Sequence, residues 1–511
     1  MRLPTGGHSS GLASQLSRCV LAGLWNLNSP SKKDQESNDT LNPSAGVLSQ
    51  SSARRKEVSL KTASSTTQEP TSPCEISESN PTRVRWRIMA IVMAIMAVTA
   101  LNRLNLSIAG KAIEEDFSFS TLTMGVVFSA FLWGYGLFQI PWGYVCDRIG
   151  PRRTLTVAIF IFAVGTGAMA LVPTMAPMAG ISVLAGFRMV RFVTGVGEAA
   201  ISSNVTRVIA SWTSLRERGF ASGLQVCGLG LGGTLTPVFI AWTMVYWGWR
   251  VSFEVCAVLA FVVVTLWHFY ATDWPEEHSD VNDPELQIVH PGSRHSDVGA
   301  RSTHRGVTSV PWLRMLTSLS VWGLILGYGF QGYTFYVYYN WFYFYAVKMR
   351  GLGIMQAAAW TSAPFLAMAL LSPVGGWFSD RVAQVSDRRR GRLAAVWLGM
   401  GVSALLLYSG NHLSVTVIAL PMIALAAGFN MFAAANFWAS CIDLSPSCSA
   451  SLSALMNTLG SIGGVISSTV TASIVVHQGW GPALDVAVWI TLGAGLLFTL
   501  VNANQSIEVE A

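Results

Sequence analysis

The chain has 511 residues, of which 51% are hydrophobic and only 12% are charged, and its mean hydropathy is +0.44. Soluble domains carry about 25% charged residues, so these charges are too few to cover the surfaces of several soluble domains. Repeated apolar stretches of about 20 residues instead predict a polytopic membrane protein. The seven cysteines are scattered without paired spacing, which indicates neither a disulfide framework nor a metal site.

The N-terminal segment, residues 1–82, differs in composition from the rest of the chain. Ser and Thr supply 23 of the first 80 residues, with basic and acidic residues mixed among them. Such a segment buries too little apolar surface to offset its ordering entropy, so we expect a disordered cytoplasmic tail. The apolar run from Cys19 to Trp25 is too short to predict a signal peptide.

Twelve apolar segments follow the tail and predict twelve transmembrane helices. We expect them at residues 88–110, 123–144, 155–173, 180–209, 219–243, 251–271, 316–346, 354–378, 393–409, 415–439, 451–474 and 483–503. A polar central loop, residues 272–315, divides the chain into six-helix halves at 83–271 and 316–503, and a short tail covers 504–511. The predicted fold is therefore an all-α polytopic membrane protein.

Basic residues in the short loops predict the orientation of these helices. If the N-terminus is cytoplasmic, the inner side carries 17 arginines, at positions 83, 85, 87, 148, 152, 153, 216, 218, 294, 301, 305, 314, 381, 388, 389, 390 and 392. The outer side carries four basic residues, at positions 111, 250, 348 and 350. We therefore expect a cell-membrane protein with both termini cytoplasmic. The net charge of +6 then reflects topology and not a nucleic-acid partner.

An internal repeat supports two halves in parallel orientation. The stretch from Gly143 to Arg148 returns as Gly376 to Arg381, at an offset of 233 residues. Gly248-Trp249 returns as Gly479-Trp480, at an offset of 231. Two parallel six-helix halves with a site between them are the architecture of major facilitator transporters. A twelve-helix channel or membrane enzyme does not predict this repeat.

The loop after the second predicted helix resembles the G-x-x-x-D-R-x-G-R-[RK] signature of the major facilitator superfamily. We interpret it, with its second copy, as a conformational latch formed by Gly143, Asp147, Arg148, Gly150, Arg152, Asp380 and Arg381. Asp147 is expected to accept hydrogen bonds from Arg148 or Arg152 and to lie at a neighbouring helix N-terminus. The alternative is a basic loop that serves topology alone.

Among the ionisable residues inside the apolar helices, where a charge is costly and by default marks function, three are the clearest. They are Arg103 in the first helix and Arg191 and Glu198 in the fourth. Arg191 and Glu198 are two helical turns apart, so they share a face about 10 Å apart along the axis. Arginine presents a planar fork that matches a carboxylate. The alternative is a static ion pair that only holds the fourth helix against the first.

Five stretches of the chain resemble the anion:cation symporter family of the major facilitator superfamily. They are Arg103 with Asn105-Leu-Ser, the run from Phe131 to Pro141, Arg191 with Gly197-Glu198-Ala199, Arg216-Glu-Arg-Gly219, and Leu455-Met-Asn457. The resemblance covers residues 83–503 and implies proton-coupled uptake of small organic anions. It assigns the carboxylate to Arg103 and the proton to Glu198, with Arg191 as the partner that tunes Glu198 and meets the anion.

The same resemblance implies further substrate ligands in Tyr135, Trp438 and Asn457. Many bacterial members have Asp before the Arg of the first helix, where this chain has Asn102, so Glu198 is left as the sole expected titrating group. From the residues themselves we add Gln225, for which helix–helix contact is an equal alternative. We also add Tyr336 and Asn340 from the aromatic run of the seventh helix, for which an interfacial aromatic belt is the alternative.

Together these features predict a secondary transporter that imports a small organic anion with protons, and a sugar acid such as a hexuronate, aldonate or aldarate is the expected substrate. No nucleotide-binding motif is found in the sequence, so a gradient is the expected energy source. The alternatives are a major facilitator exporter of drugs or metabolites and a transporter of another carboxylate such as tartrate or a phthalate-like acid. We expect no enzyme activity, cofactor or metal, and a functional monomer in the lipid bilayer.

Overall fold

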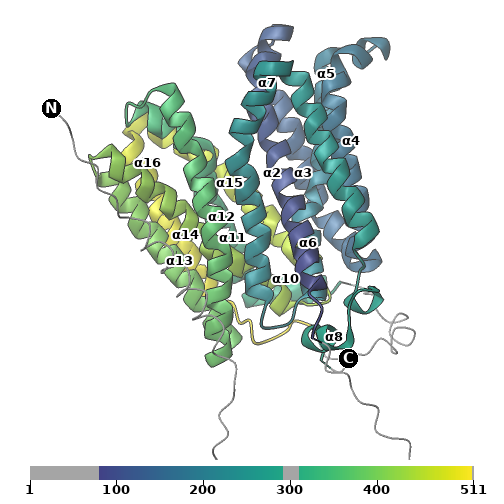
Figure 1. Cartoon of the computed structure of the whole chain (residues 1–511). Coiled ribbons are helices and arrows are strands. Elements are labelled where there is room, and N and C mark those ends of the chain that lie inside the picture. The colour runs from purple at the N-terminus through teal and green to yellow at the C-terminus, as the bar shows by residue number, and fades with distance from the viewer. Residues whose placement is uncertain (1–79, 292–309, 509–511) are drawn as a thin grey trace, which may run out of the picture. The chain divides into compact units, whose positions relative to one another are not determined.

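The computed structural model describes residues 80–291 and 310–508. The expected N-terminal tail lies outside the described residues up to position 79. The same holds for residues 509–511 and for part of the central loop, 292–309, with Arg294, Arg301 and Arg305. Within the described ranges the regular elements are helices, and no strand occurs (Figure 1).

The first half contains six helical elements. They are α2 (Val84–Phe117), α3 (Thr121–Ile149), α4 (Pro151–Met178), α5 (Val183–Ala199), α6 (Ile201–Trp212) and α7 (Arg218–Tyr270). Side-chain caps fix two of the starts, since Ser120 accepts from the Thr123 N–H and Ser182 from the Ala185 N–H. The fourth predicted helix appears as α5 and α6, and Ala200 between them keeps α-like angles (φ −75°, ψ −29°).

The second half begins after a short central region. That region holds the 3₁₀ turn η1 (Pro275–Glu277) and the helices α8 (Asp283–Val289) and α10 (Trp312–Thr317). The half itself consists of α11 (Leu319–Lys348), α12 (Ile354–Val385), α13 (Arg388–His412), α14 (Thr416–Leu444), α15 (Ser449–Gln478) and α16 (Trp480–Phe498). Figure 1 shows α8 and α10 at one end of the helical bundle.

Eight helices of the described residues are long and apolar enough to cross a bilayer. One of them, α7, contains two predicted spans, because its backbone breaks at Gly248 (φ 81°, ψ 170°). The other three predicted spans are α5 with α6, α11 and α12, which lie outside that set. The described helices therefore provide the twelve predicted crossings.

The internal repeat is also present in the backbone. Gly248 breaks α7 between the fifth and sixth spans, and Gly479 separates α15 from α16 with nearly the same angles (φ 93°, ψ −177°). A positive φ of this size is strained for any residue with a Cβ, so glycine is required at both joints. The two Gly-Trp pairs therefore mark equivalent corners of the two halves.

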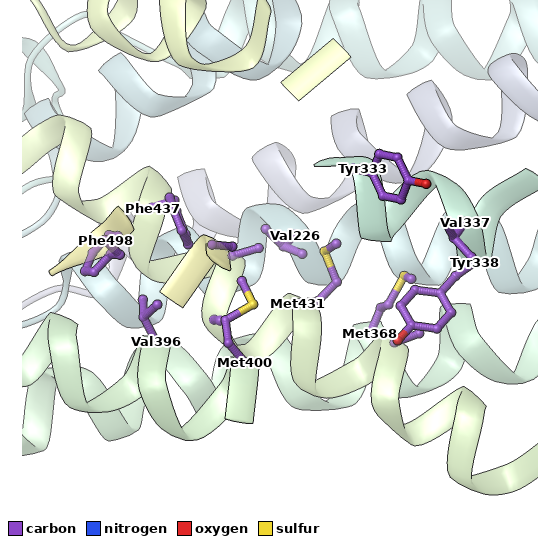
Figure 2. Packing of buried hydrophobic residues seen from close by; sticks show 14 of the residues in the cluster. Val226, Tyr333, Val337, Tyr338, Met368, Val396, Met400, Met431, Phe437 and Phe498 are labelled. Carbon is purple, nitrogen blue, oxygen red and sulfur yellow. The ribbon is translucent and has the colours of Figure 1, made fainter. Parts of the chain in front are cut away.

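The distribution of apolar and polar side chains is typical of a membrane-embedded protein. Large apolar side chains face outward, for example Trp133, Leu235 and Trp489, whereas Asn430 and Asn436 are fully buried. Figure 2 shows part of the core of the second half, where Met431, Phe437 and Phe498 pack together with Val226 of α7. Hydrocarbon provides no hydrogen bonds, and Asn430 finds its partner on another helix, where it accepts from Nε2 of Gln331 at 2.7 Å.

The two halves touch along α7 with α12 and along α3 and α6 with α15. The closest approaches use glycine: a Cβ on Gly143 of α3 would lie 2.7 Å from the carbonyl oxygen of Ala450. We call the end of the bundle that carries Arg148, Arg216 and Arg381 the basic end. Gly143 and Ala450 meet near this end, where α3 finishes and α15 begins.

Candidate functional site

A cavity lies between the two halves of the chain. Its walls come from α2, α3, α6 and α7 on one side and from α11, α14 and α15 on the other. Six of the eight predicted substrate ligands line it: Arg103, Tyr135, Gln225, Tyr336, Trp438 and Asn457. These residues are spread over more than 350 positions of sequence, and the packing of the two halves brings them together.

A buried ion pair stands at the first-half wall of this cavity. The Nε of Arg103 donates to Oε1 of Glu198 at 2.7 Å, and Nη2 of Arg103 donates to the same oxygen. The side chain of Glu198 is 1% exposed and that of Arg103 is 21% exposed. The second oxygen of Glu198, Oε2, is buried without a hydrogen-bond partner. Arg103 therefore faces the cavity, while Glu198 keeps one oxygen free of the pair.

Arg191 does not take the position expected for it. Its guanidinium lies over the ring of Phe131, 4.6 Å from the centroid, and it neither lines the cavity nor forms an ion pair with Glu198 among the described residues. Two helical turns separate Arg191 from Glu198 on one helix, whereas α2 packs beside them and brings Arg103 within hydrogen-bond distance. The hydrogen-bonded partner of Glu198 is therefore Arg103, whereas Arg191 acts on Glu198 only through its charge.

Hydrogen bonds join the two walls of the cavity. Nδ2 of Asn457 on α15 donates to the Tyr135 hydroxyl on α3 at 2.8 Å, and the Arg103 guanidinium lies 4.8 Å from the centre of the Tyr135 ring. One turn further along, Nε2 of Gln139 donates to Ser461 Oγ at 3.3 Å. A ligand that binds Tyr135 or Asn457 would therefore change a contact between the halves.

Gln225 combines the two roles that the sequence left open. Its Nε2 donates to the backbone carbonyl of Ser202, which joins α7 to α6, whereas its Oε1 is buried without a partner. Gln225 also lines the cavity, so this buried oxygen is an unsatisfied acceptor close to it. On the opposite wall, the Trp438 ring packs edge-on against Tyr328 with centroids 5.6 Å apart.

The aromatic run of α11 is divided between the cavity and the interior. Tyr336 lines the cavity, as predicted. Asn340, one turn later, does not line it, because its Nδ2 donates to Ser468 Oγ on α15 at 3.0 Å. The structure thus assigns Asn340 to helix contact, and its expected place in the substrate site was wrong.

The predicted latch lies at the basic end. Asp147, at the end of α3, accepts from the backbone N–H groups of Ala450 (3.2 Å) and Ser451 (2.8 Å) in the first turn of α15. Its expected position at a neighbouring helix N-terminus is therefore present, in favourable alignment with the helix dipole. A cation beside it is Arg207 of α6, at 3.9 Å.

Arg152 lies apart from this carboxylate. Its backbone N–H donates to Asp273 at 2.7 Å and its guanidinium donates to the carbonyl of His268, so the expected bond to Asp147 was wrong for this residue. Burial raises the pKa of Asp273, which lies outside the helices. Gly150 (φ 94°) passes so close to Asp273 that a Cβ would lie 2.7 Å from its carboxylate.

The second copy of the motif makes an equivalent contact. Asp380, near the end of α12, accepts from the N–H groups of Gly219 (3.1 Å) and Phe220 (2.8 Å) in the first turn of α7. Arg392 bridges Asp380 and Asp443, and Arg218 of the first half also binds Asp443, at 3.2 Å. Each half thus places a carboxylate at the start of a helix of the other half.

Two arginines of the motif lie against aromatic rings. The Arg148 guanidinium lies 4.9 Å from the Tyr144 ring centre, and that of Arg381 lies 5.8 Å from the Trp377 ring centre. The spacing from arginine back to ring is four residues in both copies, so one helical turn brings each pair together. Both arginines thus cover an aromatic ring at the basic end.

The C-terminal segment adds a contact that the sequence did not predict. The Glu508 carboxylate accepts from Ser445 Oγ and from the N–H groups of Ser447 (3.0 Å) and Cys448 (3.1 Å), just before α15 begins. Burial and the nearby carboxylates of Asp147 and Glu508 raise the pKa of Cys448 to about 12. The C-terminal segment therefore stabilises the loop before α15, next to the helix start that Asp147 of the first half caps.

Several polar residues of the site were missed by the sequence interpretation. They are Thr99, Gln139, Ser202, Tyr328, Gln331 and Ser461. Gln139 and Gln331 carried a signal that could have found them, since each is an amide within an apolar helix. The small hydroxyl residues carried none, because serine and threonine in membrane helices usually bond to their own backbone.

The amino-acid sequence of the chain is similar to a family model and to several transporters. A model described as Major Facilitator Superfamily matches residues 90–468. The chain is 28% identical over 438 residues to the "Probable sulfoacetate transporter" of Cupriavidus necator, which covers 83% of this chain and 96% of that protein. It is 27% identical over 437 residues to a "Probable galactarate/D-glucarate transporter" of Escherichia coli K12 (84% and 96% covered). It is also 26% identical to a "D-galactonate transporter" of Escherichia coli O6:H1 (83% and 97% covered).

Solved structures with the same fold include two proton symporters. The proton:xylose symporter bound to a bromodeoxyglucose superposes with a TM-score of 0.65 at 16% identity, over 81% of this chain and 94% of that one. The Escherichia coli fucose:proton symporter superposes with a TM-score of 0.60 at 14% identity, over 82% and 100%. At these identities the comparison speaks for the fold alone.

Proposed function

Because the chain belongs to the major facilitator superfamily, we propose that it is a proton-coupled symporter that takes up a small organic anion, with a sugar acid as the substrate class. The observation that carries this proposal is the Arg103–Glu198 pair at the wall of the cavity between the halves. The relatives named for sugar acids support the substrate class. Because these relatives are named as transporters, they support a transport role for this chain, and not an enzymatic one.

The pair supplies a mechanism for coupling the anion to a proton. A substrate carboxylate that reaches Arg103 competes with Glu198 for the same guanidinium fork. If the substrate displaces Glu198 from Arg103, the buried Glu198 loses its hydrogen-bonded counter-ion, a costly state that protonation relieves. The unpartnered Oε2 can accept that proton without disturbing Oε1. Anion and proton then favour each other's binding.

The latches supply the conformational part of the cycle. Asp147 and Asp380 hold the basic end closed from both halves. By the positive-inside rule we assign this end to the cytoplasm, with the chain in the cell membrane and both described ends of the chain inside. To open the cytoplasmic side, both carboxylates must leave the helix N-termini that they cap. The cavity then becomes accessible from the cytoplasm.

An exporter of cationic drugs is a weaker explanation of this cavity. Among the described lining residues there is no Asp or Glu, and the ionised group that reaches the wall is Arg103. A cationic substrate would be repelled by that guanidinium. The chemistry of the wall therefore favours an anion.

Uptake into liposomes tests the proposal. Purified protein is reconstituted, an inward proton gradient is imposed, and accumulation of labelled hexuronates and aldonates is measured with and without the gradient. Glu198→Gln should abolish gradient-driven accumulation and retain exchange of internal for external substrate. Glu254→Gln is the matched control, since that glutamate is exposed and away from the cavity. Full gradient-driven accumulation by Glu198→Gln would contradict the coupling role. Replacing sodium by potassium in the buffers tests whether sodium and not protons drives uptake.

A further inference from the structure

We propose that the cavity selects monoanions, and that its preferred substrate has one carboxylate followed by a hydroxylated chain, to the exclusion of dicarboxylates of the same length. This inference rests on the proposed function and narrows its substrate class. It is carried by the arrangement of charge and of hydrogen-bonding groups around the cavity. That arrangement is strongly asymmetric between the two halves.

The first-half wall offers one guanidinium. Arg103 lines the cavity, with 21% of its side chain exposed, and its partner Glu198 does not reach the wall. Arg191 is 4% exposed, lies over the Phe131 ring and is not among the lining residues. One carboxylate can therefore be neutralised, and its place is at Arg103.

The second-half wall offers hydrogen bonds without charge. Its polar lining consists of Tyr328, Gln331, Tyr336, Trp438, Asn457 and Ser461. No Lys, Arg or His from the described part of the chain occurs among the lining residues of this half. A group that extends from Arg103 toward this wall meets phenol, amide, indole and hydroxyl groups, which suit alcohol groups of a ligand.

Gln225 adds a direct discrimination between an alcohol and a carboxylate. Its amide N–H₂ donates to the Ser202 carbonyl, so the atom left unpartnered is the carbonyl oxygen Oε1, which is buried next to the cavity. That oxygen is an acceptor and is satisfied by a ligand O–H donor. An ionised carboxylate has no donor to offer and would be repelled.

A six-carbon dicarboxylate cannot satisfy this cavity at both ends. Its two carboxylates lie at opposite ends of the chain, so one engages Arg103 and the other is desolvated against the uncharged wall. Burying a charge without a partner is far more costly than burying an alcohol that finds an acceptor. We expect the dicarboxylate to be taken up with at least tenfold lower kcat/KM.

The experiment compares pairs that differ at one end only. Gluconate against glucarate, and galactonate against galactarate, share their hydroxyl stereochemistry but end in an alcohol or a carboxylate. Uptake of each labelled compound is measured with wild-type protein in liposomes under the same proton gradient at neutral pH. The proposal is supported if the monoanion of a pair is favoured at least tenfold. It is overturned if the monoanion is favoured by less than tenfold, or if the dianion is preferred.

A charge added to the second-half wall tests the cause. Met431 of α14 lines the cavity and has no hydrogen bond to lose, so Met431→Lys adds a cation to the second-half wall with little change in length. The dianion-to-monoanion ratio should rise at least fivefold, whereas the uncharged control Met431→Gln should leave it unchanged. If Met431→Lys does not fold, the wild-type ratios still decide. Failure to transport any of the four compounds and any of the hexuronates would instead refute the proposed function itself.

Discussion

Gly143 provides the most direct test of the latch at the basic end. In the structure, a Cβ added to this residue would lie 2.7 Å from the Ala450 carbonyl oxygen and 2.8 Å from the Ala454 Cβ, whereas ordinary contact begins at 3.4 Å. Gly143→Ala therefore forces α3 and α15 apart by about 0.7 Å. The Ala450 N–H already lies 3.2 Å from Asp147, so this shift breaks that hydrogen bond.

The magnitude follows from the bond that is lost. A hydrogen bond to a charged acceptor contributes about 1.5–3 kcal/mol, so closure of the basic end should weaken by roughly 10- to 150-fold in population. Gly136→Ala is the matched control, because Gly136 lies on the same helix and a Cβ there has no atom within 4 Å. Both variants gain the same helix propensity, about 1 kcal/mol, which cancels in the comparison.

Cys448 reports the change directly. Its side chain is 1% exposed beside the latch, and its pKa of about 12 keeps it a protonated thiol at neutral pH. Opening exposes the sulfur and removes the causes of the raised pKa, so maleimide labelling at this peptide should accelerate at least tenfold in Gly143→Ala, as measured by mass spectrometry. The Gly136→Ala protein should label like the wild type. Equal protection of Cys448 in both variants would refute the latch.

Four further changes give separate expectations. Glu508→Gln should accelerate labelling of Cys448 less than Gly143→Ala does, because the amide oxygen still accepts from the loop; no acceleration would show that the C-terminal segment does not hold the gate. Arg103→Lys keeps the charge but loses the fork, so uptake should fall at least tenfold with unchanged elution in size-exclusion chromatography. Asn457→Leu leaves the Tyr135 hydroxyl without its donor, and we expect KM for uptake to rise about tenfold, with wild-type KM counting against a ligand role. Asp387 caps α13 through the Arg390 N–H, which lowers its pKa, so Asp387→Ala should lower Tm above the usual Asp pKa, and the difference should vanish as pH falls through the lowered pKa; a pH-independent difference would contradict the cap.

The sequence predicted most of the fold because the bilayer imposes simple rules. Length and apolarity located the twelve crossings, and the paired Gly-Trp corners at Gly248 and Gly479 gave the parallel repeat. Boundaries were less accurate. The structure extends α2 to Phe117 and α12 to Val385, well beyond the apolar segments, because a helix continues through polar residues once its backbone hydrogen bonds are satisfied.

The site was predicted in composition and only partly in arrangement. Arg103, Tyr135, Gln225, Tyr336, Trp438 and Asn457 all line the cavity. The family resemblance implied that Arg191 tunes Glu198, and the aromatic run of the seventh helix led us to expect Asn340 in the cavity with Tyr336. The contacts that Arg191 and Asn340 make were out of reach for one reason: spacing along a helix fixes which residues share a face, but not which neighbouring helix that face meets.

The sequence by itself determined the solvent of this protein, its two-half repeat and the few charged residues placed within apolar helices. These follow from the cost of exposing polar groups to hydrocarbon, which is read one segment at a time. Only the tertiary structure decided that Glu198 pairs with Arg103, that Asp147 and Asp380 cap helices of the opposite half, and that Glu508 holds the loop before α15. Each of these contacts joins segments that are far apart in sequence, and their distances depend on how whole helices pack against one another.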